Sequence, residues 1–257
     1  MPTNRGFSLS IGLNAVSPDH YGGWDGKLNA CENDAYYFDE LLCTSGFNTS
    51  VLLTEQATIN AYTDWHLQTA KVARAGDHVV VTYSMHGGQN IGQTPLEGLD
   101  ETFCFYDGEF LDDYNYRLLV NYRKGVRISM YIDCCHSGGL DRGGVTVASA
   151  TIKAAPNDLK RPHPQLSWLR QSLTPSPTVK ASVAILAACA KTEVAYDGSE
   201  HGAFTAAVKM SLEANRNINH ATLHKCVLKN ITAPQTPQLL FVGNELSYFK
   251  SERVMSM

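Results

Sequence analysis

The strongest constraint on the fold of this chain is a series of short apolar runs that alternate with helical patterns. Each run has the length of a strand and is bounded by polar or glycine-containing segments. Six runs predict strands over residues 7–16, 48–53, 78–83, 126–132, 182–188 and 238–242. Strands that alternate with helices predict βαβ units, and therefore a mostly parallel sheet with helices on both faces.

The segments between these runs carry apolar residues at helical spacing. We expect the first helix to open at Asn29, because Glu32 three residues later completes a capping-box pattern, and to end near Gly46. Further helices are predicted over residues 59–73, 204–214 and 221–231.

Two segments interrupt this alternation. Residues 97–113 hold seven acids and no lysine or arginine, so they form an acidic segment. Residues 143–181 contain a glycine pair, five prolines and scattered basic residues, which predicts a long loop. A loop of this length in a compact domain is usually functional or disordered.

Composition excludes several classes of protein. A length of 257 residues fits one large domain or two closely joined lobes. The net charge of −4 gives no basic surface for nucleic acid, and no apolar stretch reaches the roughly 20 residues of a membrane helix. The seven cysteines show no disulfide framework, so we expect reduced thiols and a cytoplasmic protein.

Two of the predicted strands end in residues that can perform chemistry. Residues 133–138 read Asp-Cys-Cys-His-Ser-Gly, and residues 84–88 read Ser-Met-His-Gly-Gly. In open α/β sheets, ligands bind outside the carboxyl ends of the strands. A thiol and an imidazole at neighbouring strand ends are the components of a cysteine nucleophile and its acid/base partner.

Strand alternation selects between the candidate thiols and imidazoles. Side chains alternate between faces, so Cys135 shares a face with Asp133, whereas Cys134 faces the core. The same count places Ser84 with His86. His136 follows Cys135 directly and points away from it. We therefore expect Cys135 to be the exposed nucleophile and His86 to be its partner.

Simpler readings of these residues compete with catalysis. A cysteine is often a small buried hydrophobe, and a histidine is often a structural hydrogen-bonding group. A zinc site is disfavoured because adjacent ligands splay apart and no C-x₂-C pair exists, which also argues against a thioredoxin-type redox site. The other cysteines show no ligand spacing: Cys31, Cys43, Cys104, Cys189 and Cys226.

These motifs resemble the caspase-like cysteine peptidases, and among them the metacaspases of the prokaryotic type (orthocaspases). Residues 83–87 match the family's histidine motif Tyr-Ser-Gly-His-Gly except at Met85, and residues 133–138 match its nucleophile motif Asp-(Ser/Cys)-Cys-His-Ser-Gly throughout. Further matches are residues 31–35, residues 186–189 with Glu193 and Ala195, and residues 202–205. Because the family usually has glycine at the position of Met85, this bulky residue could reshape the substrate cleft.

The resemblance implies an α/β fold, the caspase-like three-layer sandwich with about six mostly parallel strands. It implies one peptidase domain over residues 1–257. A large-subunit-like part would span residues 1–142, a linker loop residues 143–181 and a small-subunit-like part residues 182–257. It favours a monomer.

The resemblance also implies hydrolysis of peptide bonds through an acyl-enzyme. Cys135 would attack the carbonyl and His86 would transfer protons, which is worth about 10²–10⁴-fold in rate. The backbone N–H groups of Gly87 and Cys135 would hold the oxyanion.

Asp133 indicates which substrates would bind. A carboxylate beside the thiol disfavours the thiolate unless a cation compensates it, and a substrate lysine or arginine would do so. In metacaspases the positions of Asp34, Ser84 and Asp133 line a pocket for such a residue. We therefore expect a protein or peptide substrate with Arg or Lys before the cut. The alternatives are a helix-start charge for Asp34 and a strand-end cap for Asp133.

The acidic segment suggests calcium, which takes hard oxygen ligands. The resemblance maps the family's calcium aspartates to Asp100, Asp112, Asp113 and Asp141. A solvated acidic loop is the alternative reading. No organic cofactor is expected.

The linker loop contains five basic residues, so an enzyme that cuts after Lys or Arg could process itself there: Lys153, Lys160, Arg161, Arg170 and Lys180. Two rival functions remain. One is a catalytically weak or inactive caspase-like scaffold or binding module, for which Met85 is the indication. The other is a selective protease that cuts one partner protein and ignores short peptides.

Overall fold

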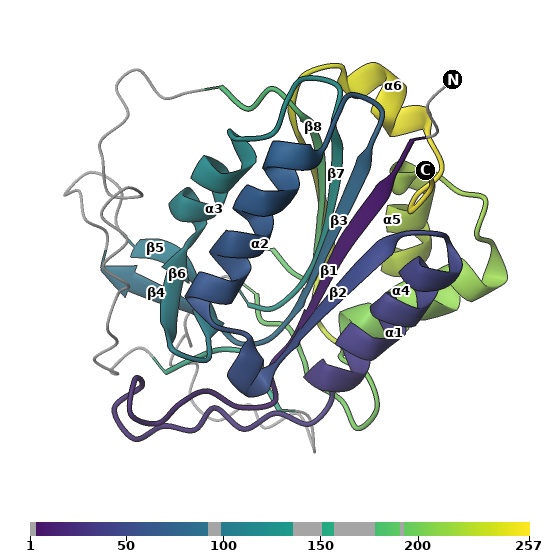
Figure 1. Ribbon diagram of the computed structural model, residues 1–257. Helices are drawn as coiled ribbons and strands as arrows, with labels where there is room; N and C mark the ends of the chain where they lie inside the picture. The colour runs from purple at the N-terminus through teal and green to yellow at the C-terminus, as the bar shows by residue number, and fades with distance from the viewer. Residues whose placement is uncertain (1–3, 92–98, 136–150, 157–177, 191–192) are drawn as a thin grey trace.

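The computed structural model describes residues 4–91, 99–135, 151–156, 178–190 and 193–257, and its centre is a six-stranded sheet (Figure 1). The strand order is β2-β1-β3-β7-β8-β9, and only β9 runs antiparallel to its neighbour. The strands are β1 (Gly6–Gly12), β2 (Asn48–Leu53), β3 (His78–Ser84), β7 (Arg127–Asp133), β8 (Ser182–Ala187) and β9 (Gln238–Gly243). All six strands were predicted, and the last two lie beyond the linker loop.

Helices cover both faces of this sheet, as the alternation predicted. α2 (Ile59–Val72) and α3 (Asp112–Leu119) lie on one face, and α1 (Cys31–Thr44), α4 (Ala203–Ala214) and α5 (His220–Asn230) lie on the other (Figure 1). A short α6 (Leu246–Ser251) packs near the end of β8 and β9, and a 3₁₀ turn, η1 (Thr54–Gln56), follows β2. These three layers are the architecture of the caspase-like sandwich.

The acidic segment contains a sheet that its sequence did not predict. A small antiparallel sheet consists of β4 (Gly87–Ile91), β5 (Leu99–Phe105) and β6 (Gly108–Leu111), and α3 follows it directly. Phe103 and Phe105 lie two residues apart and precede the sequence Asp107-Gly108, which is a hairpin signal. The turn itself consists of Tyr106 and Asp107, and Gly108 begins β6. Part of this segment is therefore a buried hairpin rather than a loop.

The alternation along β3 and β7 separates two cores. One set of alternating residues along β3 and β7 packs with α2 and α3. It consists of residues 79, 81, 83 and 85 on one strand and residues 128, 130, 132 and 134 on the other. Val80, Tyr131 and Cys135 pack with α1 and α4 instead. The alternation continues past the end of each regular strand, so neighbouring residues 134 and 135 face opposite layers.

Two local predictions differ from the structure. β1 ends at Gly12 rather than at residue 16, and a side chain at Gly12 would collide with the backbone of Cys31. The first helix begins at Cys31 without a capping box. The N-terminal end of this helix is capped by the Asn14 side chain, whose Oδ1 accepts from the Cys31 N–H at 2.9 Å. Glu32 is therefore free to accept from the Thr54 hydroxyl.

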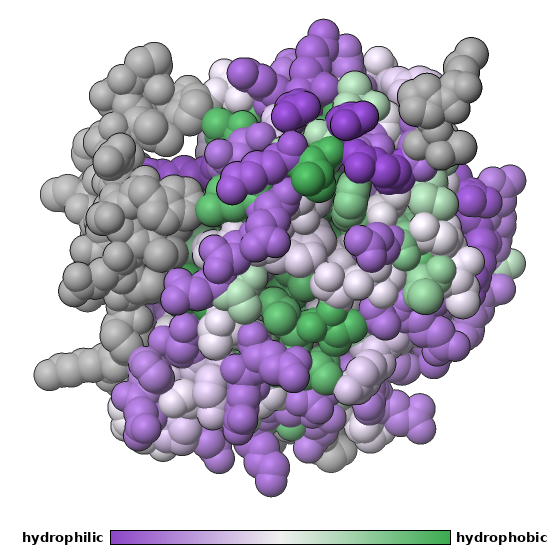
Figure 2. All heavy atoms as spheres, viewed as in Figure 1, coloured by the Kyte–Doolittle hydropathy of each residue, from purple (hydrophilic) through white to green (hydrophobic). Residues whose placement is uncertain are grey.

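The view of Figure 2 shows a largely hydrophilic surface with an apolar area between α2 and β2. β2 is one of the two edge strands of the central sheet, and its residues 49–53 are half-buried. No helix in the described parts of the chain is long and apolar enough to cross a membrane.

Candidate active site

The two strand-end motifs meet at one edge of the sheet. β3 and β7 are parallel neighbours, and their register pairs Ser84 with Asp133. His86 and Cys135 each follow two residues later, so both belong to the same rim. Parallel pairing is the reason, because it brings the carboxyl ends of neighbouring strands together.

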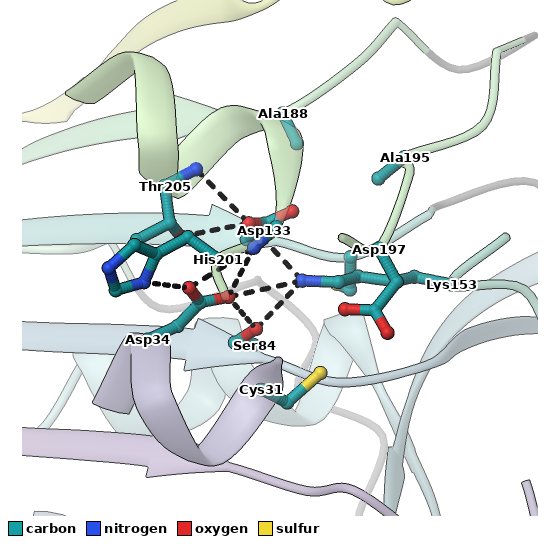
Figure 3. A network of polar contacts seen from close by, with 12 residues as sticks. Cys31, Asp34, Ser84, Asp133, Lys153, Ala188, Ala195, Asp197, His201 and Thr205 are labelled. Carbon is teal, nitrogen blue, oxygen red and sulfur yellow. Dashed lines mark hydrogen bonds and ion pairs between the residues drawn. The ribbon is translucent and has the colours of Figure 1, made fainter. Parts of the chain in front are cut away.

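Asp34, Ser84 and Asp133 surround the ammonium group of Lys153, which comes from the described segment 151–156 (Figure 3). Lys153 Nζ lies 3.3 Å from Asp34 Oδ2, 3.2 Å from Asp133 Oδ2 and 2.8 Å from Ser84 Oγ. The Ser84 hydroxyl donates in turn to Asp34 at 2.6 Å. All four side chains are buried, so they form a closed anionic pocket with a lysine inside it.

Residues before and within α4 hold the two carboxylates in place. The Thr205 hydroxyl and N–H donate to Asp133 Oδ2 at 2.8 and 3.2 Å. His201 Nδ1 lies 3.0 Å from Asp34 Oδ1, and Lys209 Nζ lies 3.1 Å from the other ring nitrogen. His201 was not identified from the sequence, although it immediately precedes the matched residues 202–205.

A cation in this pocket offsets part of the charge of its two carboxylates. Burial raises the pKa of Asp133 most, and the neighbouring Asp34 raises it further, while the Lys153 ammonium acts in the opposite direction. Burial alone would lower the pKa of Lys153, but the surrounding carboxylates outweigh it and keep the pKa above its usual range. Two carboxylates in a dry pocket therefore favour a bound ammonium or guanidinium group.

The carbonyl of Lys153 occupies the expected oxyanion position. It accepts from the N–H of Gly87 at 3.0 Å and from the N–H of Cys135 at 3.4 Å. A side chain at residue 87 would overlap the carbonyl oxygen of Cys135, so this close approach of two backbones requires glycine.

The Cys135 thiol is buried, contrary to the expected exposure, in a cluster against which Ala154 of segment 151–156 packs. Its Sγ accepts from the Ala195 N–H at 2.8 Å. Burial is the main cause that raises the pKa of this thiol well above its ordinary value, with Cys189 adding to it. The thiol is neutral in this arrangement.

The ring of His86 is held by Gly26 and Trp24. Its Nε2 lies 2.9 Å from the carbonyl oxygen of Gly26, and the Trp24 ring lies 4.8 Å from it between centroids. A carbonyl only accepts, so Nε2 carries the proton and Nδ1 is the basic nitrogen of the neutral ring.

Met85 and Cys134 do not enter the cleft. Both are fully buried in the core that packs against α2 and α3, on the opposite face from the anionic pocket. The expectation that Met85 could reshape the cleft is therefore wrong. The indication for an inactive scaffold disappears with it.

The described part of the chain contains Asp112 and Asp113, which are exposed in the first turn of α3. They line a hollow of about 620 Å³ together with Glu101. The side chain of Asp100 and all of Asp141 and His136 lie outside the described residues. Within those residues, no group of three or more His, Cys, Asp or Glu is placed to hold a metal ion.

The model of the caspase domain matches residues 15–245 of this chain. The chain belongs to the caspase domain family. This membership implies a cysteine peptidase, and it confirms the predicted resemblance to the metacaspases and caspases.

Individual relatives agree with the family assignment. Metacaspase-1 of Saccharomyces cerevisiae (strain YJM789) is 28% identical over 176 residues, covering 60% of this chain and 38% of the relative. Metacaspase-4 of Arabidopsis thaliana is 30% identical over 165 residues, covering 59% and 38%. The matched region thus spans little more than a third of these relatives.

Two solved structures share the fold. Protein GSU0716 from Geobacter sulfurreducens has a TM-score of 0.81 and 30% identity, with 98% of both chains covered. Caspase-1 from Spodoptera frugiperda has a TM-score of 0.57 and 14% identity, covering 94% of this chain and 90% of its own. The second likeness concerns the fold alone.

Proposed function

We propose that this chain hydrolyses peptide bonds after Arg or Lys, with Cys135 as the nucleophile and His86 as the acid/base. The observation that carries the proposal is the placement of Lys153. Its side chain fills the anionic pocket while its carbonyl rests against the N–H groups of Gly87 and Cys135. A residue that immediately precedes a scissile bond, the P1 residue, needs both of these contacts.

Electrostatics supports a basic P1 residue over an acidic one. Two unit charges 4 Å apart attract by about 4 kcal/mol at an effective dielectric of 20, before desolvation costs. A P1 aspartate would instead place a third carboxylate beside Asp34 and Asp133. Like charges in a buried site are strongly unfavourable.

The proposed reaction uses groups at the same edge. The Cys135 thiol turns from Ala195 toward the substrate carbonyl and gives its proton to His86. Sγ then bonds to the carbonyl carbon, and the N–H groups of Gly87 and Cys135 stabilise the oxyanion. The C–N bond breaks as His86 protonates the leaving amine. Water, deprotonated by His86, hydrolyses the thioester and releases the acid and free thiol.

A P1 profile tests the proposal. Peptides that are identical except for Arg, Lys, Gln or Asp before the cut are compared by kcat/KM. We expect the Arg and Lys peptides to exceed Gln by about 10²-fold or more, and Asp to be the poorest. A preference for Asp would contradict the proposal. Failure to cut any short peptide, with labelling of Cys135 by a basic covalent trap, would favour the selective protease.

The same contacts support self-processing within the linker. Among its basic residues, Lys153 is the one in the described chain whose carbonyl meets the oxyanion groups. The bond from Lys153 to Ala154 is therefore the one proposed to be cut. Until it is cut, the segment shields the neutral Cys135 thiol. We place this enzyme in the cytoplasm as a monomer, with proteins or peptides as its partners.

Calcium is proposed as an activator. Asp112 and Asp113 are exposed carboxylates on α3, and the family resemblance assigns them to calcium together with Asp100 and Asp141. Carboxylate oxygens are the hard ligands that calcium takes, but the described residues alone do not complete a site. Calcium would offset the repulsion among these acids.

Peptidase activity should rise several-fold between chelator and millimolar calcium. The double variant Asp112→Asn with Asp113→Asn should lose this response. Glu40→Gln, which removes an exposed acid of α1, serves as the control and should keep it. Equal activity with chelator and calcium in the unaltered enzyme would contradict the activating role.

A further inference from the structure

Segment 151–156 continues beyond Lys153, so it shows how the chain lies after the proposed scissile bond. Ala154 forms a parallel bridge with Gly87, and the Ala155 N–H donates to the Gly87 carbonyl at 2.8 Å. The side chain of Ala155 is fully buried in a small cluster with Val16, Tyr21 and Cys104. Counted from the proposed cut, Ala154 is P1′ and Ala155 is P2′.

We propose that Val16, Tyr21, Trp24 and Cys104 form a second specificity pocket, which accepts a small apolar residue at P2′ of the substrate. This inference rests on the proposed function, because it takes segment 151–156 as a bound substrate. It adds a requirement on the far side of the cut, where the basic pocket has no influence.

The walls of this pocket are fixed by contacts outside it. The Tyr21 hydroxyl donates to the carbonyl of Phe105 at 2.7 Å, and the Tyr21 and Trp24 rings pack edge to face at 6.0 Å between centroids. A side chain at Gly26 would come within 3.0 Å of Val16 and 3.1 Å of Trp24. Fixed walls cannot expand readily around a larger residue.

The pocket also adjoins the catalytic histidine. The Trp24 ring packs on the His86 ring, and the Cys104 N–H donates to the His86 carbonyl at 3.0 Å. A P2′ residue that displaced Trp24 or Cys104 would therefore also disturb His86. We expect a poor fit at P2′ to lower kcat as well as to raise KM.

The residues before P1 are held mainly through their backbone rather than in a side-chain pocket. Ile152, at P2, is 38% exposed and bridges Tyr196 through its backbone. The Lys153 N–H donates to the Ala195 carbonyl at 3.0 Å, and the Asp197 N–H donates to the Thr151 carbonyl at 2.7 Å. Residues before P1 are thus held by main-chain contacts that accept many side chains.

Internally quenched peptides of the sequence Thr-Ile-Lys-Ala-X-Pro test the pocket, with X as Ala, Leu, Trp or Asp and the full chain as enzyme. Ala should be best. Leu or Trp overfills the cluster and Asp places a charge among apolar groups, so we expect kcat/KM to fall on the order of 10- to 100-fold for Trp and Asp. A matched series varied at P2 should change by only a few-fold.

Val16→Ala enlarges the pocket and should raise the kcat/KM ratio of the Leu to the Ala peptide by at least about fivefold. Val72→Ala alters a half-exposed side chain on α2 and should leave this ratio unchanged. Equal rates for every X in the unaltered enzyme would contradict the proposed P2′ pocket but leave the preference for a basic P1 residue intact. Absence of cleavage after Lys in the whole series would overturn the proposed function itself.

Discussion

Replacing Cys135 with alanine should lower kcat/KM for an Arg or Lys peptide by about 10⁴-fold or more, whereas Cys134→Ala should keep activity within a few-fold. Loss of the nucleophile removes the covalent path, and deletions of this kind in hydrolases cost about 10⁴ to 10⁶ in rate. Cys134 packs in the core against α2 and α3, on the far side of the sheet from the pocket. Its truncation removes only one buried sulfur atom and should cost about 1 kcal/mol of stability.

The pair of variants is a matched control because the two thiols are neighbours and both are buried. Thermal unfolding should show both variants folded, so that a loss of rate in one reports chemistry. The reverse pattern, with Cys134→Ala inactive and Cys135→Ala active, would mean that the strand alternation assigns the wrong thiol to the cleft.

Replacing Lys153 with glutamine should strongly slow cleavage between Lys153 and Ala154. Glutamine keeps most of the side-chain length but leaves Asp34 and Asp133 without a cation. Removing one partner of a buried charge pair costs about 2–5 kcal/mol, which slows cleavage by roughly 30- to 5,000-fold. Mass spectrometry of the unaltered protein should find a fragment that ends at Lys153 and one that begins at Ala154.

Lys153→Arg is the control, since its guanidinium restores the charge and should preserve the cut. Cys135→Ala should prevent it. In Lys153→Gln, segment 151–156 is held less firmly. Alkylation of Cys135 by iodoacetamide should therefore be faster in this variant than in the unaltered protein before it is cut. Fragments of the same mass from Cys135→Ala, or an undiminished cut in Lys153→Gln, would rule out self-processing at this bond.

Much of this fold follows from local patterns. Apolar runs of strand length that alternate with amphipathic segments leave few arrangements other than a covered, mostly parallel sheet. Alternation along β3 and β7 then determines that Ser84 and Asp133 share a face and that Cys134 and Cys135 do not. These periodicities are properties of consecutive residues, so they can be read without knowing what lies nearby in space.

The hairpin of β5 and β6 was missed for a different reason. Its acids suggested a solvated loop, yet Glu109 is fully buried and accepts from the Thr102 hydroxyl at 2.8 Å. A cross-strand partner offsets the cost of burying such a group, and this partner becomes visible only when the strands are paired.

By itself, the sequence determined the covered parallel sheet and the rim that carries both His86 and Cys135, because periodicity and parallel pairing suffice for both. Only the tertiary structure decided that Lys153 occupies the pocket of Asp34, Ser84 and Asp133, and that Ala155 fills a pocket beside His86. Those contacts join segments up to 139 residues apart, as between Val16 and Ala155. These contacts depend on the charge of the pocket and on the space between helices and strands that pack together, and no local sequence pattern encodes either.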